Sequence, residues 1–508
     1  MTAPLFTTND AEFSKLEGVY IKETDPPAGV TEQSLNVVGI FGETLKGPDT
    51  PVSITNEARF VEVFGGGYLG GVLVNKVWKS ILNKGFSQLV VNRVRAAAAV
   101  KASFTLETAD AGGGTAIVRV DASSVGTWGN SVRIKVENAT NGVSTSWNLR
   151  AIDDTTGKSY LWENINTATG FDNTAEIFGT DDGRLIDVTK LASGRPINST
   201  ATVDGADADG YINLGETVAA FTSVAGTDGT VADSDYTGSA KPLQVLAGYP
   251  GVAIVFPAEY MTAAVQGGME TAANASSDRM FLIGPLAHTT SISAAITDVA
   301  DYRHDRLIYC YNHPYTTDPT TATEILTRPE SWMASILANT DVDIHPGEED
   351  TKRFLSGITR LYQPSIVRTD YVLLRAAGIS ALEVDLGSPV FVSGVVTSLT
   401  PGKTEITRRR MADFLQLSAA YTLRYHVKKK NTVERRRAIA ATLKGWLSNL
   451  KRASRVVEDF EIDGEILNNA TDRAAGIERV LMRVKILGHM LHVVLQTEIG
   501  TGVTIVAQ

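Results

Sequence analysis

The chain has 508 residues and one cysteine, with ordinary globular proportions of apolar (43%) and charged (20%) residues. This composition excludes wholesale disorder, and the length predicts several domains. The net charge of −10 argues against a protein that coats nucleic acid, and a single cysteine excludes an internal disulfide.

The first hundred residues predict an extended arm followed by part of an α/β layer. Residues 1–22 show no clear periodicity beyond a short β-prone run, so we assign them to an N-terminal arm. Apolar runs at 35–41 and 89–91 predict buried strands, and helical spacing of apolar residues lies between them. Residues 23–100 are therefore expected to form the first part of an α/β core.

Residues 101–240 differ from the preceding segment in glycine content and residue pattern, and they predict an inserted β-rich domain. They hold 17 of the 45 glycines, and short alternating runs such as 117–120 and 132–136 are separated by Gly, Asn and Asp. This pattern is typical of a β-sandwich or barrel. The domain is expected to be an insertion, because the alternation of predicted strands and helices resumes after it.

From residue 241 to residue 390 the sequence predicts a second stretch of α/β structure. Strands are expected at 252–256, 279–283 and 306–309, with helices at 260–276 and 291–302 between them. This alternation indicates βαβαβ connectivity and a mostly parallel sheet.

Residues 391–498 predict a pair of helices followed by strands. Met411, Phe414, Leu415, Ser418, Tyr421 and Tyr425 share helical spacing, and Asn431 is placed to cap a second helix. Alternation over 480–486 indicates a half-exposed strand, and residues 499–508 form a C-terminal arm with β-prone residues. The predicted fold class is thus multi-domain α/β (α+β), with a discontinuous core, an inserted β domain and two arms.

Charge is distributed unevenly along this chain. Residues 401–508 carry a net charge of +8, and residues 1–400 carry −18. Nine of the positive charges form three triplets: Arg408, Arg409, Arg410, Lys428, Lys429, Lys430, Arg435, Arg436 and Arg437. They either solvate helix faces or form a docking surface for an acidic partner. Nucleic-acid binding would favour exposed aromatic residues beside them, and Tyr421, Tyr425 and Trp446 are expected to face inward.

Two glycine-rich segments resemble nucleotide-binding motifs. Residues 65–70 fit G-x-G-x-x-G, but the preceding stretch is helical and no acidic residue follows before Glu107. Residues 402–404 (GKT) resemble the end of a P-loop, but Thr397 stands where the motif needs glycine. Structural turns explain both segments better than nucleotide binding does.

Metal and catalytic signals are weak in this sequence. Residues 205–216 follow the frame of a calcium loop, but Gly205 occupies the first ligand position, so an acidic loop of the β domain is favoured. Cys310 and His313 lack a second pair that would complete a zinc site. We therefore predict no catalytic residue, no metal site and no cofactor.

Several short motifs occur in a definite order along the chain. They are residues 17–23 (EGVYIKE), 37–43 (VVGIFGE), 60–66 (FVEVFGG), 89–94 (LVVNRV), 126–130 (GTWGN), 226–229 (GTDG) and 235–238 (DYTG). This order resembles contractile tail sheath proteins of myophages and related contractile injection systems. The glycines at 65–67 fall in that family's Phe-Gly-Gly turn.

The resemblance implies a structural subunit without enzymatic activity. Such subunits form stacked hexameric rings around a tail tube and contract from a metastable extended state, which drives the tube through the host envelope. The expected partners are other copies of the chain, the tail tube protein, and baseplate and tail terminator proteins. Nucleic acid and direct membrane insertion are not expected, and the expected location is a virion tail assembled in the host cytoplasm. The alternative is a nucleotide-dependent α/β enzyme.

The resemblance also implies roles for two groups of residues. The arms are expected to exchange strands between subunits through Val19, Tyr20, Ile21, Val503, Ile505 and Val506. The nine basic residues of the triplets are expected to face the tube, and the β domain of residues 101–240 is expected to decorate the outside.

Overall fold

A computed structural model describes residues 30–65, 88–109, 113–154, 157–167, 183–203, 205–216, 218, 221–258, 260–317, 322–385, 387–429, 432–464, 469, 471–472 and 475–489. The chain forms two compact units. The α/β unit is Leu35–Arg409, and the terminal unit combines Met1–Ser34 with Arg410–Gln508. These boundaries differ from those predicted near residues 22 and 390. The second one is hidden in the sequence because one continuous helix, α10 (Ile406–Arg424), crosses it.

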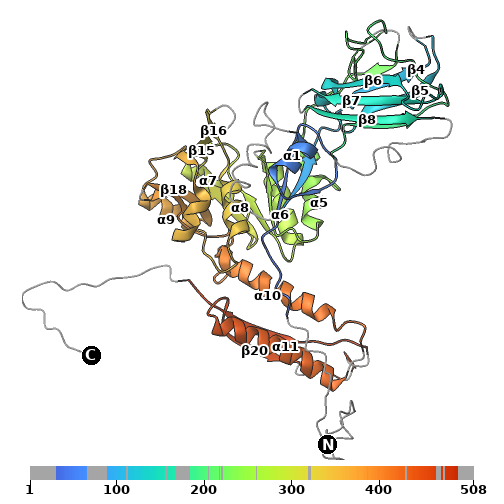
Figure 1. Ribbon diagram of the computed structural model, residues 1–508. Helices are drawn as coiled ribbons and strands as arrows, with labels where there is room; N and C mark the ends of the chain where they lie inside the picture. The colour runs from blue at the N-terminus through green and yellow to red at the C-terminus, as the bar shows by residue number, and fades with distance from the viewer. Residues whose placement is uncertain are drawn as a thin grey trace, which may run out of the picture. The chain divides into compact units, whose positions relative to one another are not determined.

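An eight-stranded sheet organises the α/β unit (Figure 1). Its strand order is β19-β18-β14-β13-β12-β1-β3-β2, and all neighbours are parallel except the antiparallel edge strands β2 and β19. The strands are β1 (Val38–Glu43), β2 (Val52–Ile54), β3 (Leu89–Val94), β12 (Ile254–Pro257), β13 (Met280–Ile283), β14 (Leu307–Tyr311), β18 (Ile379–Asp385) and β19 (Ser388–Phe391).

The strand order shows that the β domain is an insertion in the α/β domain. β1 pairs with β3 on one side and with β12 on the other, although residues 95–253 separate β3 from β12 in the chain. The central strands are continuous apolar runs, as expected for a parallel sheet covered on both faces.

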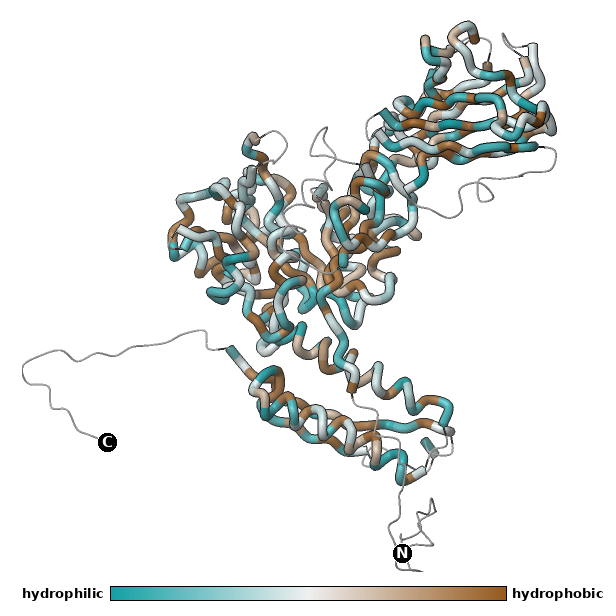
Figure 2. Tube along the Cα trace, in the orientation of Figure 1, coloured by the Kyte–Doolittle hydropathy of each residue, from teal (hydrophilic) through white to brown (hydrophobic). Residues whose placement is uncertain are grey.

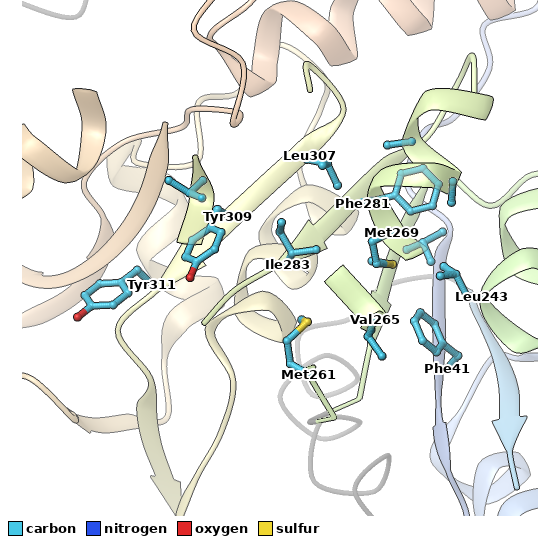
Figure 3. Packing of buried hydrophobic residues seen from close by; sticks show 14 of the residues in the cluster. Phe41, Leu243, Met261, Val265, Met269, Phe281, Ile283, Leu307, Tyr309 and Tyr311 are labelled. Atoms are coloured by element: carbon cyan, nitrogen blue, oxygen red, sulfur yellow. The ribbon is translucent and has the colours of Figure 1, made fainter. Parts of the chain in front are cut away.

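The helices of this unit are α1 (Glu57–Phe64), α4 (Asp233–Thr237), α5 (Pro242–Gly248), α6 (Ala263–Ala275), α7 (Ile292–Val299), α8 (Pro329–Asn339) and α9 (Arg368–Ala376). Side chains from α4, α5, α6, α7 and α9 share one hydrophobic cluster with the sheet. Figure 3 shows part of it, with Phe41, Phe281 and Leu307 lying near Val265 and Met269 of α6. The helices predicted at 260–276 and 291–302 are confirmed with shorter limits, because Thr262 and Ser291 cap their first turns.

The inserted domain is a β-sandwich, one of the two predicted alternatives. One sheet has the order β10-β6-β7-β8 and the other β11-β4-β5-β9. The strands are β4 (Ser103–Glu107), β5 (Ala116–Ala122), β6 (Val132–Asn138), β7 (Trp147–Asp153), β8 (Lys158–Ile165), β9 (Ile186–Lys190), β10 (Ile212–Asn213) and β11 (Ser223–Val224). Hydrophobic and hydrophilic residues alternate along these strands (Figure 2), and the inward residues of both sheets form one core. The sandwich ends before residue 240, since Tyr236 packs in the α/β core.

Smaller elements complete both units. A three-stranded sheet of β15 (Pro314–Thr317), β16 (Glu324–Leu326) and β17 (Ile358–Leu361) lies in the α/β unit, with 3-10 helices at Thr127–Ser131 and Glu349–Leu355. In the terminal unit, α10 and α11 (Val433–Arg452) accompany the antiparallel pair β20 (Val457–Asp463) and β21 (Leu481–Ile486). No helix of the described chain is long and apolar enough to cross a membrane.

Candidate functional site

The basic helix pair α10–α11 is the candidate interaction site of the terminal unit. Ile439, Leu443, Trp446, Leu447 and Leu450 recur at helical spacing and form the buried face of α11. The cap of α11 is Thr432, whose Oγ1 accepts the Arg435 N–H at 3.3 Å. The prediction of Asn431 as the cap is therefore wrong by one residue, and Asn431 itself lies outside the described residues.

The described start of the chain is anchored to this helix pair. The Gln33 N–H donates to Ser418 Oγ of α10 at 3.0 Å, and Trp446 Nε1 of α11 donates to Glu32 Oε1 at 3.1 Å. Val30 packs against the cluster of Ala419, Ile439 and Leu443. The predicted strand-exchange residues Val19, Tyr20, Ile21, Val503, Ile505 and Val506 lie outside the described residues.

Positive charge is concentrated on the helix pair α10–α11 and the segment that joins the two helices. Residues 406–452 contain 13 Lys and Arg residues but only two acidic residues, Asp413 and Glu434. Asp413 is buried, so it contributes little negative charge at the surface. Electrostatic complementarity with an acidic partner steers association and orients docking.

The nine predicted tube-facing residues do not form one surface. Arg410 (1% exposed) and Arg436 (7% exposed) are buried, and this corrects the prediction that they face a partner. Arg408 pairs with Glu405 at 3.2 Å, and Arg409 pairs with Asp305 at 3.3 Å. Three consecutive residues of a helix span about 200° of its circumference, so one member of each helical arginine triplet, Arg410 in α10 and Arg436 in α11, turns inward.

The remaining basic residues are better placed for a partner. Lys428, Lys429 and Arg437 are exposed, Arg435 is half-buried, and Lys430 lies outside the described residues. We call Lys428, Lys429 and Arg437 the exposed basic set.

Two tyrosines near the end of α10 are exposed, contrary to the prediction that they face inward, and one of them contacts this set. Tyr421 is 51% exposed and Tyr425 is 55% exposed, and Lys429 Nζ lies 3.1 Å from the centre of the Tyr425 ring. The inward stripe of α10 continues from Ser418 to Thr422, which points Tyr421 about 100° away from it. Trp446 is buried, as predicted.

Strands β20 and β21 provide a second candidate contact. Within the described part of the terminal unit they pair only with each other. An open edge is a template for an added strand. The alternation over residues 480–486 predicts β21, whereas β20 is not evident in the sequence because a register shift between Val457 and Asp459 interrupts the period-two pattern.

The segments that resemble ligand motifs have structural roles. Gly65 ends α1 with a φ of 90°, and residues 66–70 lie outside the described residues. Lys403 Nζ, beside a turn at Gly402, lies 3.9 Å from Asp305. In the calcium-like loop, Asp207 accepts the N–H groups of Asp209 and Tyr211 and pairs with Arg133 at 2.9 Å. The described residues contain no group of three or more His, Cys, Asp or Glu side chains that could hold a metal ion.

His313 makes the stability of the α/β unit depend on pH. Burial lowers its pKa to about 2, whereas a histidine in an unfolded chain has a pKa of about 6.5. Below pH 6.5 the unfolded chain binds a proton that the folded chain does not bind, so stability falls as the pH drops from 6.5 toward 2.

We expect this one group to lower the free energy of unfolding by about 2 kcal/mol between pH 7 and pH 5. Urea unfolding at the two pH values should show that loss in the natural protein and not in His313→Leu. His288→Leu, which removes an exposed neighbouring histidine, is the control and should retain the dependence. Equal pH dependence in His313→Leu and the natural protein would contradict this assignment.

Comparison with known proteins gives matches to solved structures. No family model matches the chain, and no curated protein matches it. The sheath tail protein from Listeria innocua is similar with a TM-score of 0.63 at 13% identity, over 90% of this chain and 96% of that one. The sheath tail protein from Desulfitobacterium hafniense is similar with a TM-score of 0.58 at 12% identity, over 92% and 100%.

A helical assembly gives a third match. The contracted helical sheath of the anti-feeding prophage is similar with a TM-score of 0.55 at 10% identity, over 96% of this chain and 99% of that one. The three similarities cover nearly the whole length of each chain. The resemblance found in the sequence is therefore confirmed at the level of fold: this chain has the multi-domain α/β fold of contractile-sheath proteins.

Proposed function

We propose that the protein is the sheath subunit of a contractile tail or of a related contractile injection system. The observation that carries this proposal is the full-length match to sheath proteins, which includes the inserted sandwich and the terminal helices. The proposed role needs no chemistry: subunits assemble as stacked rings around a tail tube and contract from a metastable extended state.

The terminal unit supplies the contacts that such an assembly needs. The exposed basic set would dock on an acidic tube surface, and the outer edges of β20 and β21 would accept strands from the arms of neighbouring subunits. Main-chain hydrogen bonds across such shared strands would tether subunits while allowing them to tilt. Baseplate and tail terminator proteins would bind the two ends of the sheath, in a virion tail assembled in the host cytoplasm.

Negative-stain electron microscopy of the purified protein tests this proposal. We expect helical tubes or polysheaths when the protein is concentrated or mixed with its tail tube and baseplate proteins. A particle that remains a small monomer in the presence of both would overturn the proposal.

A further inference from the structure

A cavity of about 410 Å³ opens at the carboxyl end of β3, between the loop after β1 and the turn before α5. Ligands of α/β sheets commonly bind outside the carboxyl ends of parallel strands. Five charged side chains line this cavity: Asp49, Arg93, Arg95, Asp235 and Lys241.

Arg93 is a buried cation that pairs with no carboxylate among the described residues. It is 5% exposed, and its Nη1 and Nη2 donate to the carbonyl oxygens of Gly47 and Val125 at 3.1 and 2.9 Å. Its Nε has no hydrogen-bond partner in the part of the chain that the structure describes. Burial lowers the pKa of Arg93 to about 10, so the group remains charged at neutral pH.

The acidic groups nearest to Arg93 are already engaged. Both oxygens of Asp49 accept from Arg95 Nε at 2.8 Å. Asp228 accepts the Thr127 N–H at 2.9 Å and the Thr127 hydroxyl at 2.6 Å. Arg93 therefore has opposite charge in its vicinity but no ion pair of its own.

Lys241, the third cation of the cavity, is also neutralised by a carboxylate. Lys241 Nζ lies 3.0 Å from Asp235 Oδ1. Arg95 is matched by Asp49 and Lys241 by Asp235, so the lining has a surplus of one positive charge, which belongs to Arg93. Buried charges in proteins are normally paired, because an unpaired one loses its hydration without compensation.

The wall of the cavity also contains an uncommon backbone conformation. Ala240 has a φ of 57°, in the left-handed region, which costs a residue with a Cβ roughly 1–2 kcal/mol. This residue lies in the turn between Ser239 and Lys241, both of which line the cavity. Strained backbone of this kind concentrates at binding sites, where the surrounding structure enforces it.

We propose that this cavity binds one carboxylate group, presented by an acidic side chain of a second copy of this chain. A monoanion balances the single surplus charge, whereas the carboxylates of Asp49 and Asp235 would repel a phosphate dianion. The second copy is the source favoured by charge, since residues 1–400 carry a net charge of −18. That source rests on the proposed assembly into a sheath, but the carboxylate chemistry of the cavity does not.

Thermal unfolding of the unassembled protein in sodium acetate tests the chemistry. Compared with sodium chloride at equal ionic strength, 0.1 M acetate should raise the Tm by about 1–3 °C if its Kd is near 10 mM. Arg95→Gln should abolish the shift, because it frees Asp49 to neutralise Arg93. Arg360→Gln removes an arginine from a similarly exposed pair with Glu324 outside the cavity, and it should retain the shift.

Two results in this experiment would overturn the carboxylate site. One is an acetate shift that is the same in Arg95→Gln and in the natural protein, or that is absent from the natural protein. The other is a larger shift with phosphate than with acetate, which would show that the cavity prefers a dianion.

Polymerisation followed by sedimentation tests whether a second copy of the chain supplies the bound carboxylate. Lys241→Glu changes the net charge of the lining from +1 to −1 and should reduce the sedimented polymer at least tenfold. Lys101→Glu reverses a lysine of similar exposure that pairs with Asp187, and it should polymerise normally. Circular dichroism first establishes that both variants are folded.

Normal polymerisation of Lys241→Glu would overturn the second copy as the source. If the natural protein does not polymerise, the proposed sheath function fails, and the acetate experiment still decides whether the cavity binds carboxylate.

Discussion

Reversing the exposed basic set to glutamate should abolish assembly of an extended sheath on tail tubes. The triple variant Lys428→Glu, Lys429→Glu and Arg437→Glu removes three exposed positive charges from the helix pair and adds three negative ones. An acidic tube surface would then repel the helix pair instead of attracting it. The measurement is the fraction of sheathed tubes in electron micrographs after coexpression with the tube protein, and we expect a decrease of more than tenfold.

Substitutions at these three exposed positions test docking without disturbing folding. Substitution of the complete triplets would disturb both. Arg410 and Arg436 are buried, so glutamate at either position would destabilise the terminal unit whatever the partner. The matched control is reversal of Arg119, Arg360 and Lys403, three exposed cations of the α/β unit. The control should give near-normal sheaths, and normal sheaths with the first variant would show that the helix pair does not bind the tube through charge.

Salt provides an independent measure of the same interaction. The screening length shortens from about 10 Å at 0.1 M salt to about 3 Å at 1 M. Docking of the natural protein should therefore weaken as salt is raised before assembly. The few triple-variant sheaths should show little salt dependence.

Replacing Glu330 with alanine should cause the largest loss of stability in the α/β unit. Glu330 is fully buried in α8, and its carboxylate accepts from Arg328 Nη2 at 2.9 Å and from Arg328 Nε at 3.2 Å. Arg328 is also buried and donates to the Pro285 carbonyl oxygen at 2.8 Å. Removing the carboxylate leaves a buried guanidinium unpaired, and we expect a loss of about 3–5 kcal/mol in the free energy of unfolding.

Urea unfolding followed by circular dichroism measures this loss, and an exposed glutamate–arginine ion pair serves as the control. Glu324 makes the same Glu–Arg contact with Arg360 at 3.0 Å, but both side chains are exposed. Glu324→Ala should therefore cost less than about 1 kcal/mol. The double variant Arg328→Met with Glu330→Met should recover much of the lost stability, because no charge then remains buried. Similar losses for Glu330→Ala and Glu324→Ala would contradict the argument.

Local patterns predicted most of the elements, because they depend on residues close together in the sequence. The apolar runs of β12, β13 and β14 and the helices α6 and α7 are examples. Two of the errors arose where the predicted and the observed residue are neighbours in the sequence. Thr432 rather than Asn431 caps α11, and Thr422 rather than Tyr421 continues the buried stripe of α10. One residue on a helix is a rotation of about 100°, which is enough to exchange buried for exposed.

The sequence by itself determined the division into α/β and β parts, the placement of the insertion, the basic C-terminal segment and the resemblance to sheath proteins. These depend on composition, periodicity and the order of motifs, which require no knowledge of distant contacts. Tertiary structure alone decided that Arg410 and Arg436 are the buried members of the two arginine triplets, and it brought Asp49, Arg93, Arg95, Asp235 and Lys241 to one cavity. The physical reason is that burial, hydrogen bonds and ion pairs join residues as far apart in the chain as Glu32 and Trp446, and no local pattern specifies those neighbours.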